Sequence, residues 1–315
     1  MRHLLTIDEF TQEEIVDMLD LSADVKANPS RYEDAMHRKQ LLMIFDKPSL
    51  RTRLAFEAGM SQMGGHAIFY DTSTSPFGAG KETARDMIKV SSRFVDMIMA
   101  RLSDHAMIEE MGRYAEVPVI NALTNRAHPC QLLADLHTIR EKKGRLKGLK
   151  IAYCGDARNN VTYSIMTGCT LVGMDVSIAC PDDVEFQPLP ELFELAGNMA
   201  RATGRELEIT HDPILAVSDA DIVYTDSWMS YHIPKEKLKQ RMASLLPFQV
   251  NEDMMARAKP NAIFMNCLPA MRGYEQSEGV IDGPGSVVFD QAENRLHAHK
   301  AVMIKLLEWR AQTTI

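Results

Sequence analysis

Short apolar runs alternate with longer amphipathic stretches along this chain, and that alternation limits the folds open to it. Runs of four to seven residues suit buried strands, while the stretches between them repeat apolar residues at helical spacing. Alternating strands and helices are typical of parallel sheets with helical crossovers. Strands are predicted at residues 41–45, 67–70, 97–100, 118–121, 150–156, 175–179, 207–210, 222–225 and 262–265, and helices include residues 11–26, 82–94, 105–115 and 294–309.

The chain of 315 residues is long enough for two α/β domains, each with its own core. The sheet pattern stops before residues 144–148, which have a glycine at each end, and restarts at residue 150. We therefore predict an α/β protein of two domains, each a mostly parallel sheet flanked by helices. The first domain would span residues 1–144 and the second residues 145–293, with the last helix (residues 294–315) packing back on the first.

Composition excludes several classes of protein. A formal net charge of −8 argues against a nucleic-acid surface, which needs a basic face. No apolar run reaches about 18 residues, so no membrane span is expected, and the N-terminus lacks a signal-peptide core. Five cysteines without a CxxC pair predict neither a disulfide framework nor a zinc site. A cytoplasmic location is the expectation.

The first predicted strand leads into a polar turn, residues 47–53, and then into a helix. Free backbone N–H groups and the helix dipole attract an anion at such a turn. Arg51 and Arg53 add forked donors that match phosphate oxygens. The turn therefore indicates a phosphate site. The alternative is that Ser49 or Thr52 only caps the helix while both arginines are solvated.

Further polar residues follow other predicted strands of the first half. Arg101 ends one strand, and His128 and Gln131 lie in the turn after the next. Ligands of parallel α/β sheets bind beyond the carboxyl ends of the strands. Because Ser49, Arg51, Arg101, His128 and Gln131 all fall at such ends, we predict that they share one site.

A turn in the second half, beginning at Gly155, lies between a predicted strand and a helix. It lacks the second and third glycines of a dinucleotide fingerprint, so close approach of a pyrophosphate is not supported. Asn159 and Asn160 suit hydrogen bonding to a small polar ligand. The alternative, that these asparagines only cap the following helix, has equal weight.

Asp226, Trp228 and Ser230 follow another predicted strand. A carboxylate beside an indole and a hydroxyl suits an ammonium group, through charge pairing and cation–π contact. A polar loop with one buried tryptophan is the alternative.

Cys267, Leu268 and Pro269 end a further strand. A lone cysteine there is more often inert than reactive, since reactivity needs a lowered pKa. Proline favours an extended preceding residue, so Leu268 is expected to be extended and to aim backbone carbonyls at the strand edge. Arg295 is expected near that same edge.

Taken in order, five motifs of this chain resemble those of the aspartate/ornithine carbamoyltransferase family, most closely its ornithine branch. The resemblance implies carbamoyl transfer from carbamoyl phosphate to ornithine, without metal or cofactor. It also implies a homotrimer with active sites at subunit boundaries, the first domain binding carbamoyl phosphate and the second the amino acid. The motifs are residues 49–53, 128–131, 226–230, 267–269 and 290–295.

The same resemblance implies a role for individual residues. Carbamoyl phosphate would be held by Ser49, Leu50, Arg51, Thr52, Arg53, Arg101, His128, Gln131, Cys267, Leu268 and Arg295. The catalytic groups among them would be Arg101, His128, Gln131, Cys267 and Arg295. Ornithine would be bound by Asn160, Asp226, Ser230 and Tyr231.

Four departures from the family pattern leave the acceptor open. Leu50 replaces a usual threonine, and residues 75–77 replace a usual glutamine or histidine that reaches a neighbouring subunit, although Lys81 could serve instead. Residues 231–232 and Asn266 also differ from the pattern. Alternatives are therefore a carbamoyltransferase for putrescine, lysine or an acylated ornithine, or a catalytically silent paralogue that binds carbamoyl phosphate.

Overall fold

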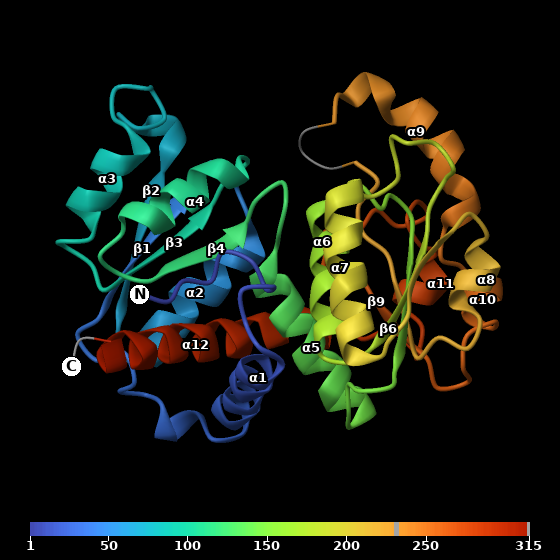
Figure 1. Cartoon of the computed structure of the whole chain (residues 1–315), viewed down its shortest axis with the longest axis horizontal. Helices are drawn as coiled ribbons and strands as arrows, with labels where there is room; N and C mark the ends of the chain where they lie inside the picture. Colours follow the sequence, from blue (N-terminus) through green and yellow to red (C-terminus); the bar gives the residue numbers. More distant parts are fainter. Residues whose placement is uncertain (230–232, 314–315) are drawn as a thin grey trace. The chain divides into compact units, whose positions relative to one another are not determined.

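The computed structural model describes residues 1–229 and 233–313 and divides the chain into two compact units (Figure 1). Unit 1 comprises Met1–His137 with Glu293–Ile315, and unit 2 comprises Thr138–Ala292. The chain passes from one unit to the other inside a helix rather than at the glycine-flanked turn. Within the described residues, no helix is long and apolar enough to cross a membrane.

Unit 1 is built on a four-stranded sheet in the order β2-β1-β3-β4, and every pair of neighbouring strands is parallel. The predicted strands of this half and their parallel pairing are confirmed. The central strand β1 is apolar and buried from residue 41 to residue 45 because parallel strands are covered on both faces. The strands are β1 (Gln40–Phe45), β2 (His66–Asp71), β3 (Met97–Arg101) and β4 (Val119–Leu123).

The side chains of β1 alternate between two layers of helix. Leu42 and Ile44 belong to a buried cluster with Met87 of α3 and Ile108 of α4. Elsewhere in unit 1, Phe56 of α2 stacks on a histidine of α12, which begins at Val288, six residues earlier than predicted. The helices are α1 (Gln12–Ala27), α2 (Leu50–Gln62), α3 (Ala84–Ser91), α4 (His105–Tyr114), α5 (Pro129–Lys143) and α12 (Val288–Thr313).

Helix α1 illustrates how local sequence sets an element boundary. The Thr11 hydroxyl accepts from the Glu14 backbone N–H at 3.2 Å, and the Glu14 carboxylate accepts from the Thr11 N–H at 2.9 Å. This reciprocal capping box satisfies two backbone donors that the first turn of a helix cannot pair. The helix predicted from residue 11 is therefore confirmed.

Unit 2 contains a five-stranded sheet in the order β7-β6-β5-β8-β9, again parallel throughout. The strand order reverses direction at β5 and β8, which is where ligands of such sheets bind. The strands are β5 (Lys150–Cys154), β6 (Asp175–Ala179), β7 (Leu207–Thr210), β8 (Ile222–Tyr224) and β9 (Ile263–Met265), and the helices are α6 (Asn160–Leu171), α7 (Pro190–Thr203), α8 (Pro213–Val217), α9 (Leu238–Leu245), α10 (Glu252–Met255) and α11 (Glu278–Ile281).

Candidate functional site

Three neighbouring strands of unit 1 end beside one another and carry the polar residues predicted there. Phe45 of β1 lies in register with Arg101 of β3, and the Asp46 N–H donates to the Arg101 carbonyl at 3.0 Å. Ser49 follows β1, and His128 follows β4, the other neighbour of β3. The residues therefore lie at one carboxyl edge of one sheet, as the strand pattern predicted.

The hydroxyls of the 47–53 turn serve both a helix cap and a distant arginine. Ser49 is the N-cap of α2, with its hydroxyl accepting from the Thr52 N–H at 3.3 Å and donating to the Thr52 hydroxyl at 3.0 Å. The Thr52 oxygen also accepts from Nη2 of Arg295 at 2.7 Å. Capping by Ser49 is thus confirmed, and the turn also receives a buried guanidinium from α12.

His128 is 4% exposed and shares its surroundings with buried arginines. Burial lowers the pKa of His128 well below its usual value, and the positive charges of Arg295 and Arg101 lower it further. The imidazole is therefore neutral at pH 7. A neutral imidazole near two guanidiniums can donate a hydrogen bond to an oxygen that becomes negative during a reaction, without giving up a proton.

Gln131 has a fixed orientation. Its Nε2 donates to Oδ1 of Asp135, one turn later in α5, at 2.8 Å. Because the carboxylate needs a donor, the amide oxygen points the other way. That oxygen is buried and accepts no hydrogen bond from the described residues, so it can accept an N–H from a ligand.

The two arginines of the 47–53 turn have different surroundings. Arg53 donates from Nε to Glu57 at 2.8 Å, and its guanidinium lies 4.0 Å from the centroid of the Phe69 ring. Nε of Arg51 is buried and has no hydrogen-bond partner among the described residues. Arg51 is therefore the arginine of this turn better suited to receive an anion.

In unit 2 the turn after β5 is shaped around an indole rather than a pyrophosphate. Gly155 has a φ of +135°, a backbone conformation that residues with a side chain rarely adopt. A Cβ at this position would also lie only 3.1 Å from Nε1 of Trp228. Asn159 caps α6, accepting from the N–H groups of Val161 and Thr162, both at 2.9 Å. Asn159 is thus the residue that caps the helix, and Asn160 is the one of the two that remains a candidate for binding a ligand.

The turns after β8 and β9 meet at a thiol and a carboxylate. Cys267 donates from Sγ to Oδ1 of Asp226 at 3.1 Å. Burial raises the pKa of Asp226, and the hydrogen bond from Cys267 opposes this rise. The structure thus brings together a residue predicted to bind ornithine, Asp226, and one predicted to be catalytic, Cys267.

The turn at Leu268 corrects one prediction and explains one departure. Leu268 has a φ of +56°, not the extended backbone predicted from the following proline. The cause is Asn266, whose Oδ1 accepts from the Leu268 N–H at 2.8 Å while its Nδ2 donates to Oε1 of Gln276 at 3.1 Å. The asparagine that replaces the family's usual histidine is therefore fully occupied within its own loop.

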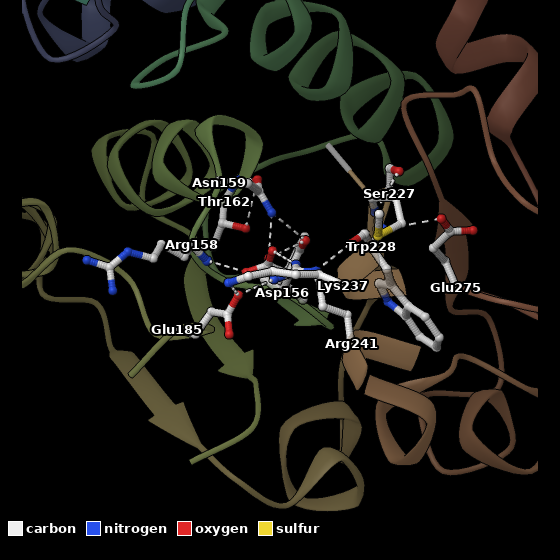
Figure 2. Close-up of polar contacts among 12 residues, drawn as sticks. Asp156, Arg158, Asn159, Thr162, Glu185, Ser227, Trp228, Lys237, Arg241 and Glu275 are labelled. Carbon is white, nitrogen blue, oxygen red and sulfur yellow. Dashed lines mark hydrogen bonds and ion pairs between the residues drawn. The ribbon is translucent and has the colours of Figure 1, made fainter. Parts of the chain in front are cut away.

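A buried polar network around Trp228 was not identified from the sequence (Figure 2). Arg241 of α9 is 3% exposed, pairs with Asp156, and donates from Nε to the Trp228 carbonyl at 3.0 Å. Glu275 accepts from the Trp228 N–H at 3.2 Å. Nothing in the sequence signals these roles, since an arginine in an amphipathic helix and a glutamate in a loop usually face solvent.

Two residues predicted for the acceptor site, Ser230 and Tyr231, lie outside the described residues, so their roles stay predictions. Among residues 1–229 and 233–313, no group of three or more histidine, cysteine, aspartate or glutamate side chains is arranged to hold a metal ion.

Comparison with known proteins gives matches along most of the chain. A family model described as "Aspartate/ornithine carbamoyltransferase, carbamoyl-P binding domain" matches residues 2–141, and its companion, the "Asp/Orn binding domain", matches residues 147–306. The chain is similar to an ornithine carbamoyltransferase of Thermococcus kodakarensis, with 46% identity over 96% of this chain and 95% of the relative. It is equally similar, at 46% identity over the same shares, to an anabolic ornithine carbamoyltransferase of Pyrococcus furiosus. The crystal structure of ornithine transcarbamoylase from Giardia lamblia superimposes with a TM-score of 0.89 at 42% identity, covering 97% of this chain and 98% of that one.

Proposed function

The chain belongs to the aspartate/ornithine carbamoyltransferase family, and on that premise we propose that it transfers the carbamoyl group of carbamoyl phosphate to the side-chain amine of ornithine, giving citrulline and phosphate. The names of the three relatives support ornithine over putrescine, lysine or an acylated ornithine. The name of the Pyrococcus furiosus relative supports a biosynthetic role. The observation that carries the proposal is the meeting of Arg101, His128 and Arg295 beside the capped start of α2.

Unit 1 would hold carbamoyl phosphate. The start of α2 supplies backbone N–H groups and the positive end of its dipole for the phosphate. Arg51 would add a forked donor, and the Ser49 and Thr52 hydroxyls lie on the same turn. Leu50 would contribute its backbone N–H group. Arg53 would add only positive charge, since its N–H already donates to the Ser49 carbonyl at 3.2 Å and its side chain contacts Glu57 and Phe69.

The carbamoyl group would be oriented by the residues at the ends of β3 and β4. Arg101 and neutral His128 would donate to its carbonyl oxygen, with Arg295 adding positive charge. Gln131 would accept an N–H of the carbamoyl nitrogen through Oε1, because its Nε2 is committed to Asp135. This refines the expectation that Gln131 is one of the catalytic groups that hold carbamoyl phosphate.

The reaction then needs no covalent enzyme intermediate. The neutral amine attacks the carbamoyl carbon, a C–N bond forms, and the carbonyl oxygen becomes an oxyanion that Arg101 and His128 stabilise. Loss of one such donor typically costs about 3–4 kcal/mol. The C–O bond to phosphate then breaks, and phosphate accepts the amine proton. Alignment of two bound substrates would supply up to roughly 7–11 kcal/mol.

Unit 2 would bind the amino acid. Asp226 offers a buried carboxylate for an ammonium group, and Asn160 follows the cap of α6. Cys267 and the Leu268 carbonyl would lie near the reacting amine. Cys267 is held by its hydrogen bond to Asp226, which supports a role in positioning rather than in covalent attack.

The acceptor is tested with labelled carbamoyl phosphate and a panel of ornithine, lysine, putrescine and acetylornithine. Citrulline formation from ornithine at the highest kcat/KM is expected. Turnover of another amine but not of ornithine would contradict the proposal. Tight binding of carbamoyl phosphate in calorimetry without turnover of any amine would instead identify a silent paralogue.

The phosphate assignment is tested by Arg51→Ala. We expect at least a hundredfold loss of carbamoyl phosphate affinity in calorimetry, because a forked charged contact is removed from a partly buried site. Arg31→Ala is the matched control, since Arg31 is an exposed arginine of the same unit that pairs with Asp24. Near-normal affinity of the Arg51 variant would refute the assignment.

We further propose a homotrimer. Unit 1 leaves apolar side chains exposed on α2 (Leu50, Leu54) and on the edge strand β2 (Ile68, Phe69), which supports burial of this face against another copy. Light scattering should give three times the chain mass of 35.4 kDa, and a monomer at micromolar concentration would contradict this. The cytoplasmic location stays a prediction from the sequence.

A further inference from the structure

Two loops of unit 2 carry the residues proposed to handle the acceptor, and Glu275 joins them. The loop after β8 contains Asp226 and Trp228, and the loop after β9 runs from Asn266 to Gln276. Oε1 of Glu275 accepts from the Trp228 N–H at 3.2 Å, and Oε2 accepts from the Met271 N–H at 2.8 Å. One carboxylate therefore holds the backbone of both loops.

This carboxylate is almost completely excluded from water, with Glu275 only 1% exposed. A buried carboxylate is costly unless hydrogen bonds compensate, so its position depends on the two backbone donors. Figure 2 shows Glu275 beside Trp228, on the opposite side of that residue from Arg241. Arg241 holds the Trp228 carbonyl at 3.0 Å, so Trp228 is fixed at both its N–H and its C=O.

Fixing Trp228 also fixes Asp226, two residues earlier on the same short loop. Across the two loops, Cys267 donates to Asp226 at 3.1 Å, a hydrogen bond that forms only when the loops keep their spacing. The Glu275 bridge and the Cys267–Asp226 bridge are thus two parallel links between the same loops. Both bridges end on a carboxylate, but only the Glu275 bridge holds backbone N–H groups of both loops.

We propose that Glu275 is a positioning residue for the amino-acid acceptor, setting the spacing between Asp226 and the Cys267–Leu268 turn. The proposal rests on the proposed function, because it assigns those two groups to the acceptor. Glu275 is not among the residues assigned to either substrate. Of the residues assigned to carbamoyl phosphate, only Cys267 and Leu268 lie on the loops that Glu275 joins, and the others belong to unit 1, so its effect should fall mainly on acceptor binding.

The protonation state of Glu275 offers a second readout. The pKa of Glu275 is raised from 4.5 to about 7, chiefly by burial and to a smaller extent by the charge of Asp226, against the opposing effect of hydrogen bonds from the backbone N–H groups of Glu275 itself, Met271 and Trp228. A protonated carboxyl group keeps only part of its acceptor capacity. The loop at Trp228 should therefore respond to pH near neutrality through Glu275.

The kinetic test is Glu275→Gln, which keeps the size of the side chain but replaces one acceptor with a donor. We expect KM for ornithine to rise roughly ten- to hundredfold, the loss for a charge-assisted hydrogen bond, and KM for carbamoyl phosphate to stay within about twofold. Glu278→Gln, an exposed glutamate of the next helix, is the matched control and should leave both constants unchanged. Equal rises in both constants, or no rise for ornithine, would overturn the proposal.

The second test does not depend on activity. The chain has two tryptophans, so Trp309→Phe leaves Trp228 as the sole indole reporter. Its fluorescence should titrate with a midpoint near pH 7, and the titration should disappear in Glu275→Gln. A titration that persists in the variant, or no titration in the Trp309→Phe chain, would overturn the positioning role.

These readouts separate the proposed function from the positioning role of Glu275. If the unmodified chain fails to carbamoylate ornithine, the proposed function is wrong, while the fluorescence titration still decides whether Glu275 controls the loop. If Glu275→Gln does not fold, the titration in the Trp309→Phe chain can be compared with the pH dependence of KM for ornithine. Different midpoints for the two would overturn the proposal.

Discussion

Arg241→Met should remove the guanidinium at the centre of the unit 2 network while keeping most of the apolar volume. Arg241 pairs with Asp156, donates to Glu185 at 3.3 Å and to the Trp228 carbonyl at 3.0 Å, and lies 4.8 Å from the Phe186 ring centroid. Methionine retains the packing against Phe186 but supplies no donor. The variant therefore isolates the polar contribution of the arginine.

The size of the loss in stability follows from the burial of Asp156, the ion-pair partner of Arg241. Asp156 is 3% exposed, so in the variant its carboxylate stays in the interior without the guanidinium that neutralises it, while the Arg158 N–H still donates to it at 2.8 Å. Removing one member of a buried ion pair typically costs about 3–5 kcal/mol, because the remaining charge is uncompensated. We expect the free energy of unfolding of unit 2 to fall by about that amount.

Chemical denaturation in a Trp309→Phe background measures this loss, because Trp228 then reports on unit 2 alone. Arg158→Met is the matched control, since Arg158 is an arginine of the same region whose guanidinium donates to the Val184 carbonyl in an exposed position. Adding Asp156→Asn to Arg241→Met should recover part of the loss, because the stranded charge is removed while an oxygen acceptor remains. A cost within about 1 kcal/mol of the control, or no recovery in the double variant, would refute the reasoning.

Three further outcomes are expected. Thr52→Val removes the oxygen that accepts from Arg295 at 2.7 Å and should weaken carbamoyl phosphate binding roughly tenfold in calorimetry; unchanged affinity would contradict a role for this contact. His299 is buried with both ring nitrogens unpartnered among the described residues, and burial lowers its pKa well below 6.5, so its folded form resists a proton that the unfolded chain takes up. The free energy of unfolding should therefore fall as pH drops below about 6.5. In His299→Leu, denaturation curves should show a dependence of this free energy on pH that is weaker by up to about 1.4 kcal/mol per pH unit. An unchanged pH dependence would contradict the prediction. Iodoacetamide should alkylate Cys267 in the folded chain but not Cys130, whose pKa is raised by burial to about 12, as peptide mass spectrometry can check.

Local signals made much of the fold predictable. The run at residues 41–45 is uniformly apolar and stops at a polar turn, so both the strand and its end were visible. The same holds for Thr11 and Ser49, whose caps depend on residues three positions away. The strand ends at Arg101 and before His128 placed those side chains at one edge because parallel strands share a carboxyl edge.

The remaining features of the site depend on contacts between distant parts of the chain. Leu268 was expected to be extended because proline follows it, but the hydrogen bond that its N–H donates to the Asn266 side chain prevailed over that local preference. The two equally weighted interpretations of the asparagine pair, ligand contact and helix cap, could not be separated until the start of α6 was located. Glu275 and Arg241 carry no local signal, since what distinguishes them is burial.

By itself, then, the sequence determined the class of fold, the two sheets, and the polar turns at their carboxyl edges, because each of these is written in residues close together along the chain. Tertiary structure decided which of those polar groups meet. Thr52 and Arg295 are 243 positions apart, and the hydrogen bond that joins them follows from the packing of α12 on α2. Tertiary burial also decided the chemistry of the groups, leaving His128 neutral beside two arginines and raising the pKa of Glu275 toward neutrality.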